Sequence, residues 1–165
     1  MDDYLRLMRL DRPVGTLLLL WPTLAALAMA ASGLPSLELI VIFTVGTFVM
    51  RSAGCVINDY ADRHVDGAVK RTKERPLVTG AINERQALQL FAALVLSAGV
   101  LILFLNTTTK LLAVGSLALA VTYPFMKRYT HLPQVVLGAA FSWGILMAWS
   151  AQDLGVPKEA LLLFI

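Results

Sequence analysis

The sequence predicts an all-α protein, a polytopic bundle of transmembrane helices with five spans and the start of a sixth. Two observations carry this prediction. The 165 residues are 58% hydrophobic and have a mean hydropathy of +0.71, whereas an ordinary soluble domain is about 45–50% apolar. The apolar residues also form long runs without alternating polar positions, which indicates helices rather than the strands of a membrane barrel.

The apolar runs define the expected spans, because a helix needs about 20 mostly apolar residues to cross the hydrocarbon core of a bilayer. The complete runs are residues 14–31, 37–57, 87–105, 111–126 and 132–151, and a sixth run begins at 161–165. Short polar turns are expected at 106–110 and 155–157. Residues 1–165 therefore form one integral-membrane helical domain, which we expect to be the N-terminal part of a longer chain.

Lysine and arginine residues gather in every second connection, which predicts the orientation of the bundle. The basic groups are Arg6, Arg9 and Arg12 before the first run, then Arg63, Lys70, Arg71, Lys73, Arg75 and Arg85 after the second, and Lys127 and Arg128 after the fourth. The other connections carry at most one each. By the positive-inside rule, the N-terminus and the two basic loops face the cytoplasm.

The composition also argues against several other classes of protein. The net charge of +3 is modest and is distributed over loops between apolar runs, so no nucleic-acid partner is expected. Cys55 is the single cysteine, which excludes an internal disulfide and a cysteine zinc cluster and predicts a small buried side chain. A cleaved signal peptide ending near Ala30 is a weaker alternative, because its apolar run is long and at least four more spans follow.

Residues 55–76, CVINDYADRHVDGAVKRTKERP, concentrate charge directly after the second apolar run. If the helix continues through them, Asn58, Asp62 and Asp66 lie on one face at the spacing i, i+4, i+8. Gly67 then offers a place for the helix to end. Like charges at this spacing repel each other, so the arrangement requires a cation to balance it.

The residues around this stripe favour a site for Mg²⁺ and diphosphate. Proteins usually hold Mg²⁺ with one or two carboxylates plus substrate phosphates, and Asp59 adds a carboxylate one position off the stripe. Basic side chains that can pair with phosphate oxygens follow at Lys70, Arg71, Lys73 and Arg75. A merely solvated loop would explain those basic residues but neither the stripe nor Arg51, an ionisable residue inside the span.

The string Asn58-Asp59-x-x-Asp62-x-x-x-Asp66 resembles the first aspartate-rich motif of the UbiA superfamily of intramembrane prenyltransferases. The resemblance also covers RLMRLDRPVGTLLLLWPT (6–23), MRSAGCVINDYADRHVDGAVKRTKERPL (50–77) and YPFMKRYTHLPQVVLGAAFSWG (123–144). Within the superfamily, the chain resembles the branch that prenylates 4-hydroxybenzoate in ubiquinone synthesis more than the haem, menaquinone or chlorophyll branches. The resemblance implies a bacterial cytoplasmic (inner) membrane protein with its active-site mouth facing the cytoplasm.

The resemblance implies roles for individual residues. Asn58, Asp62 and Asp66 match the positions that hold Mg²⁺ against the diphosphate and are the expected catalytic residues. Asp59 is expected to assist as a further metal ligand. The expected substrate-binding residues are Arg51, Arg71, Arg75, Tyr123, Lys127 and Arg9.

The fourth and fifth spans contain two further signals. Tyr123 and Lys127 lie at i, i+4, and the distribution of basic residues puts them on the same side of the membrane as Asp62. Considered alone, Tyr123 is slightly better explained as an aromatic-belt residue, and Lys127 as a plain topology signal, than as parts of a site. Gly138-x-x-x-Ser142 in the fifth span permits close packing of two helices.

The resemblance implies Mg²⁺-dependent transfer of a polyprenyl group from polyprenyl diphosphate to the ring carbon ortho to the hydroxyl of 4-hydroxybenzoate. Arg51 is a candidate partner for the benzoate carboxylate. The second aspartate motif of the family has no counterpart here, because the acids after Asp66 are only Glu74, Glu84, Asp153 and Glu159. We therefore expect the site to need the remainder of a longer chain, and this part to be inactive alone.

Other functions remain open at this point. The chain could belong to another UbiA subfamily with a different acceptor. It could be a non-catalytic membrane protein that binds prenyl diphosphate. A transporter or channel would need polar residues spaced through several spans, whereas Arg51 is nearly the only deep one.

Overall fold

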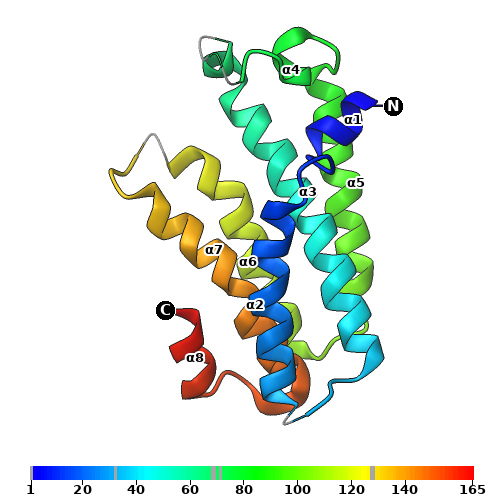
Figure 1. The fold of residues 1–165 in the computed structure, drawn as a ribbon, viewed down its shortest axis with the longest axis vertical. Helices are drawn as coiled ribbons and strands as arrows, with labels where there is room; N and C mark the ends of the chain where they lie inside the picture. The colour runs from blue at the N-terminus through cyan, green and yellow to red at the C-terminus, as the bar shows by residue number, and fades with distance from the viewer. Residues whose placement is uncertain (1, 32, 68–69, 71, 127–128) are drawn as a thin grey trace.

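The computed structural model of the chain describes residues 2–31, 33–67, 70, 72–126 and 129–165, and within these ranges the regular secondary structure is helical (Figure 1). The elements are α1 (Asp2–Leu7), α2 (Val14–Ala30), α3 (Leu37–Asp66), α4 (Pro76–Thr79), α5 (Glu84–Ile102), α6 (Thr107–Met126), α7 (Pro133–Trp149), the π-helical turn η1 (Ser150–Leu154) and α8 (Lys158–Phe164). The predicted all-α class is confirmed.

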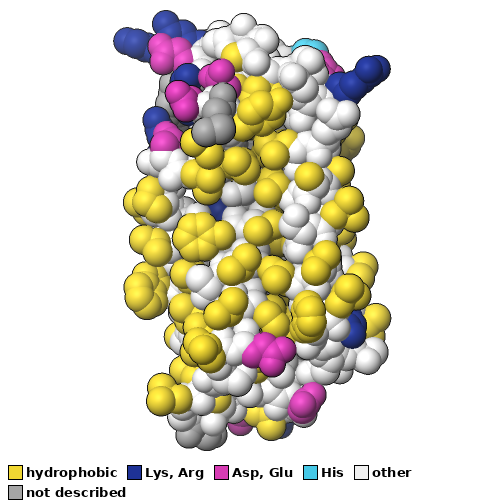
Figure 2. All heavy atoms as spheres, turned by 90° about the vertical axis from the view of Figure 1, so that its right-hand side faces the viewer, with side chains coloured by type: hydrophobic (Ala, Val, Ile, Leu, Met, Phe, Trp, Pro, Cys, Tyr) yellow, Lys and Arg dark blue, Asp and Glu magenta, His cyan; other side chains and the backbone are white. Residues whose placement is uncertain are grey.

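Four helices are long and apolar enough to cross a membrane, namely α3, α5, α6 and α7 extended through η1. The first expected span forms α2, an apolar helix of 17 residues, and the last apolar run forms the short α8. The total of five spans therefore stays a prediction. Figure 2 shows hydrophobic side chains over the middle of the molecule, with the charged groups toward its two ends. Leu96, Val114 and Leu162 are among the exposed hydrophobic residues, and lipid is the solvent that suits such a surface.

The longest helix, α3, carries the charged stretch. It has 30 residues, which corresponds to a length of about 45 Å, whereas the hydrocarbon core of a bilayer is about 30 Å thick. The helix continues without a break to Asp66, one residue before Gly67, as the sequence predicts. Its final turns, which contain Asn58 and Asp62, can therefore extend beyond the hydrocarbon core.

The long helices surround a central cavity. Helix α3 packs along α5 and also contacts α6, while α7 packs between α2 and α6 (Figure 1). A hydrophobic core closes one end, where Leu27, Phe43 and Trp149 are buried together. A smaller core at the other end buries Leu7 of α1 against Val56 of α3. Burial of Leu7 fixes the N-terminal segment beside the last turns of α3.

Close helix packing occurs at Gly144 rather than at Gly138. A Cβ atom at Gly144 would lie 2.4 Å from Oγ1 of Thr23 on α2, whereas a Cβ atom at Gly138 would meet nothing within 4 Å. Gly138 would permit close packing but has open space beside it in this structure. The spacing of small residues identifies a helix face that a neighbouring helix could approach closely, but it does not predict which face the neighbour contacts.

Residues 106–110, predicted as a turn, contain the start of α6. The side chain of Asn106 causes this early start, because its Oδ1 accepts hydrogen bonds from the backbone N–H of Thr109 at 2.9 Å and from its hydroxyl at 2.8 Å. Asparagine is among the preferred residues at helix N-caps for this reason. Lys110 consequently lies in the first turn of α6.

Candidate active site

Three segments meet at one end of the bundle, which we name the charged end. They are the last turns of α3, residues 6–12 at the end of α1 and beyond it, and residues 72–76 leading into α4 (Figure 1, upper part). The hydroxyl of Thr72 donates a 2.8 Å hydrogen bond to the carbonyl of Asp66, and Arg6 donates one of 3.2 Å to the carbonyl of Glu74. The loop is thus tied both to α3 and to the N-terminal segment.

Asn58, Asp62 and Asp66 lie on successive turns of the unbroken α3, so they share one side of the helix. Asn58 lines the central cavity, and the carboxylate of Asp66 is paired with Arg75. Within the part of the chain that the structure describes, no three Asp, Glu, His or Cys side chains converge closely enough to hold a cation alone. Two carboxylates and an amide on one stripe fit Mg²⁺ that a phosphate ligand helps to hold.

Asp59 has different surroundings from the stripe. Its side chain is only 3% exposed, and its Oδ1 accepts a 2.7 Å hydrogen bond from Nη2 of Arg9. Nη1 of Arg75 lies 3.1 Å from the same oxygen, and Arg75 also pairs with Asp66. We call this set, Arg9, Asp59, Arg75 and Asp66, the arginine–aspartate chain. It links the N-terminal segment, α3 and the following loop.

Arg9 takes part in the arginine–aspartate chain at some conformational cost. Its backbone has a φ of +56°, a left-handed conformation that costs a residue other than glycine about 1–2 kcal/mol. Burial works against its charged form and is the largest single influence, but the attraction and hydrogen bond of Asp59 together with Cys55 and Asp66 outweigh it and raise the pKa of Arg9. Arg9 therefore stays cationic at physiological pH, at the border between the charged end and the cavity.

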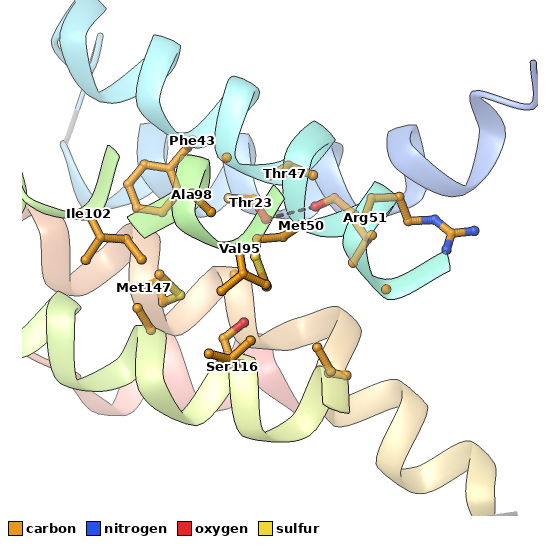
Figure 3. Close-up of a pocket in the computed structure, with 18 of the residues that line it drawn as sticks. Thr23, Phe43, Thr47, Met50, Arg51, Val95, Ala98, Ile102, Ser116 and Met147 are labelled. Carbon is orange, nitrogen blue, oxygen red and sulfur yellow. Dashed lines mark hydrogen bonds between the residues drawn. The ribbon is translucent and has the colours of Figure 1, made fainter. Parts of the chain in front are cut away.

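The central cavity is amphipathic. It has a volume of about 520 Å³ and is lined by the five long helices. Its polar lining includes Arg9, Arg51, Asn58, Tyr123, Thr23, Thr47, Ser116 and Lys110, and the rest is mostly apolar. In Figure 3, Arg51 lies at one side of the pocket and Phe43, Ile102 and Met147 lie at the other. Such a cavity suits a ligand with a charged head and an apolar tail.

Arg51 reaches the cavity because α2 leaves room for it. A Cβ atom at Gly15 would lie 2.5 Å from Nη2 of Arg51, so a larger residue there would displace the guanidinium group. Nη1 of Arg51 donates a 2.8 Å hydrogen bond to Sγ of Cys55. Cys55 is buried, which confirms the expectation for this residue.

The structure brings together several of the predicted substrate-binding residues. Arg9, Arg51 and Tyr123 line the cavity, and Arg75 lies in the arginine–aspartate chain. Two others, Arg71 and Lys127, lie outside the described residues.

The sequence analysis missed several residues beside the cavity, among them Thr23 and Lys110 of its lining. Thr47 lines it one turn before Arg51, so extending the i, i+4 spacing backwards along α3 would have identified it. Ser116 reaches the cavity from α6, and Gly15 reaches Arg51 from α2. No spacing within one helix predicts the last two.

These features define a helical bundle of the membrane-spanning kind, with acids and arginines at the mouth of an amphipathic cavity. A sequence comparison matches residues 19–165 to the UbiA prenyltransferase family. The match covers most of the chain, and the chain therefore belongs to this family.

Two curated relatives illustrate the similarity. The chain is 63% identical over 161 residues to the 4-hydroxybenzoate octaprenyltransferase of Chromohalobacter salexigens, covering 98% of this chain and 54% of that protein. It is 58% identical over 162 residues to the 4-hydroxybenzoate octaprenyltransferase of Vibrio cholerae, covering 98% and 57%. The chain thus spans about half the length of the curated relatives that it matches.

Solved structures share the fold. The apo structure of a UbiA homolog from Aeropyrum pernix K1 matches with a TM-score of 0.77 at 30% identity, covering 92% of this chain and 56% of that one. A UbiA homolog from Archaeoglobus fulgidus bound to GPP and Mg²⁺ matches with a TM-score of 0.79 at 23% identity, covering 98% and 58%. The second similarity concerns the fold alone.

Proposed function

We propose that this chain forms the diphosphate-binding half of a 4-hydroxybenzoate polyprenyltransferase, which transfers a polyprenyl group to the ring carbon ortho to the hydroxyl. One observation carries the proposal. This chain, which is 63% identical to a 4-hydroxybenzoate octaprenyltransferase, carries the oxygen-bearing side chains of Asn58, Asp62 and Asp66 on one side of α3. Asn58 also lines the amphipathic cavity.

Asn58, Asp62 and Asp66 are the proposed ligands of Mg²⁺, because amide and carboxylate oxygens are the donors that this ion prefers. Mg²⁺ bound there would neutralise negative charge that develops on the leaving diphosphate. The Archaeoglobus fulgidus homolog, which has the same fold, was solved with GPP and Mg²⁺, and this supports the assignment.

Basic side chains at the charged end bind the diphosphate in this proposal. Arg9 and Arg75 are the described candidates, and Arg71 is assigned the same role from the family motif. Lys127 is assigned to substrate binding with Tyr123. When the bond between the allylic carbon and the diphosphate oxygen breaks, the electron pair leaves with the diphosphate. Positive groups that are already in position stabilise this charge without reorganising during the reaction.

The cavity receives the prenyl group and the aromatic acceptor. Apolar side chains such as Phe43, Ile102 and Met147 surround the isoprenoid and exclude water from the allylic cation. Arg51 pairs with the carboxylate of 4-hydroxybenzoate, and Tyr123 helps to position the substrates. The ring carbon then forms the new carbon–carbon bond to the allylic carbon and loses its proton.

The charged end faces the cytoplasm of a bacterial inner membrane in this proposal. Arg6, Arg9 and Arg12 lie at that end together with residues 72–76, and positive residues are retained on the cytoplasmic side. Prenyl diphosphate, whose head group is charged, would then reach the site from the cytoplasmic face.

The test is prenyl transfer to 4-hydroxybenzoate by membranes that carry the complete gene product, with and without Mg²⁺. Inverted vesicles, which expose the cytoplasmic face, are expected to be active only with Mg²⁺, and intact spheroplasts should not use added prenyl diphosphate. Binding without transfer would contradict the proposal and favour a non-catalytic binding protein. Transfer only to another acceptor would favour a different UbiA subfamily.

A further inference from the structure

We propose that Asp59 is a positioning residue, which holds Arg9 and Arg75 at the cavity mouth for the diphosphate, and that it is not a ligand of the metal. The inference rests on the proposed function, because it concerns the same diphosphate. It separates two adjacent residues of one motif, Asn58 and Asp59, into different roles.

The first argument is the direction of the side chain. Adjacent residues on an α-helix are about 100° apart around its axis, so the side chain of Asp59 points away from that of Asn58. Asn58 lines the central cavity, whereas Asp59 lines the smaller polar pocket beside it. Asp59 is also nearly inaccessible, with 3% of its side chain exposed.

The second argument is that its oxygen already has two cationic partners. Nη2 of Arg9 lies 2.7 Å from Oδ1 of Asp59, and Nη1 of Arg75 lies 3.1 Å from the same atom. A metal ion at this oxygen would have to displace two guanidinium groups, whereas at Asp66 it would displace that of Arg75. The two arginines come from segments on opposite sides of α3 in the sequence, and Asp59 brings them to one place.

The third argument is the position of these arginines. Arg9 lines both the central cavity and a smaller polar pocket of about 320 Å³ beside it. Arg75 lines the smaller pocket, with Thr72 and Arg6. Each guanidinium has five N–H donors, so the contacts with Asp59 leave donors for phosphate oxygens. Asp59 thus aligns Arg9 and Arg75 at the boundary between the central cavity and the smaller polar pocket.

Charge balance explains why a carboxylate is required at this position. Two guanidinium groups would repel each other here without a negative group between them, and a buried carboxylate is stable only when it is well paired. An amide at position 59 keeps the shape of the side chain but removes its charge. Arg9, which is held in a left-handed conformation, would then lose its anchor.

The experiment compares Asp59→Asn with Asp62→Asn in the purified complete gene product. For Asp59→Asn we expect the KM for prenyl diphosphate to rise about tenfold to a hundredfold, with the Mg²⁺ concentration for half-maximal rate unchanged. For Asp62→Asn we expect a higher Mg²⁺ requirement. Glu84→Gln is the matched control, because Glu84 pairs with Arg63 of α3 at 2.8 Å but is half exposed, and it should change neither value.

A second readout does not depend on activity. Quenching of tryptophan fluorescence by geranyl diphosphate, titrated with and without Mg²⁺, measures binding directly. Asp59→Asn should weaken binding by a similar factor in both titrations. Arg9→Gln should also weaken binding, and the double variant Arg9→Gln/Asp59→Asn should be little worse than either single variant, because Asp59 acts through Arg9.

Three outcomes decide the matter. If Asp59→Asn raises the Mg²⁺ requirement as Asp62→Asn does, or leaves prenyl diphosphate binding intact, the inference is overturned. If Asp59→Asn does not fold, Asp59→Glu takes its place, because it keeps the charge and moves the carboxylate. It should raise the KM for prenyl diphosphate alone, and an unchanged KM overturns the inference. Absence of both transfer and binding in the unaltered protein would instead contradict the proposed function.

Discussion

The two ends of the helical bundle hold their buried polar groups in different ways. At the charged end, the carboxylate of Asp59 is buried between guanidinium groups. At the opposite end, α6 and η1 are joined mainly by neutral groups. The hydroxyls of Thr109 and Ser150, both fully buried, lie 2.7 Å apart, and Nδ2 of Asn106 donates to the carbonyl of Ser150 at 2.6 Å and to Asp153 at 2.9 Å.

The two kinds of buried polar contact differ in how much they contribute to the stability of the fold. A buried neutral group that is hydrogen-bonded contributes about 0.5–1.5 kcal/mol to stability. A buried ion pair often contributes nothing net, because desolvation offsets the attraction. Helices can therefore be joined mainly by hydroxyls and amides, as the opposite end illustrates. The charges at the charged end are better explained by a charged ligand than by stability.

The largest expected effect compares an aspartate at each end. In the complete gene product, Asp62→Asn should lower the rate of prenyl transfer by about a hundredfold or more, because a carboxylate that would hold Mg²⁺ against the leaving diphosphate is lost. Asp153→Asn should leave the rate close to normal. Asn can still accept from Asn106, and it tolerates the φ of +59° found at position 153. Equal losses in the two variants would contradict the functional difference between the ends.

A smaller effect is expected where α2 crosses α7 between the two ends. Gly144→Ala would put a Cβ atom 2.4 Å from Oγ1 of Thr23, so the helices must separate, at an expected cost of about 1–3 kcal/mol. Gly138→Ala is the control, because its Cβ atom would lie in open space, and alanine favours the helix by about 1 kcal/mol. Thermal unfolding in detergent measures both. The contact would be unimportant if both variants had the same midpoint.

The smallest effect concerns the opposite end. Thr109→Val removes the hydroxyl that meets Ser150 and Asn106, and the free energy of unfolding should fall by about 1–3 kcal/mol because buried partners lose a hydrogen bond. Affinity for prenyl diphosphate should not change. Thr109→Ser, which keeps the hydroxyl, is the control and should be more stable than Thr109→Val. A loss of affinity in the valine variant would show that this end also affects the site.

Local spacing was sufficient to predict the helices and the oxygen-bearing side chains on one side of α3. The apolar runs located α2, α3, α5, α6 and α7, and the extension of α3 to Asp66 followed from the acids at i, i+4, i+8 and from Gly67. Local spacing was not sufficient where a side chain changed a boundary or where contact with a neighbour mattered. Asn106 started α6 early, and Gly144 rather than Gly138 met another helix.

By itself, the sequence determined which segments are helical and apolar, and which polar groups share one face of α3, because both depend on residues a few positions apart. Only the tertiary structure decided that Asp59 joins Arg9 to Arg75 and that Gly15 makes room for Arg51. These contacts join residues on separate segments, and no periodicity within one helix encodes how far, or at which angle, two packed segments approach each other.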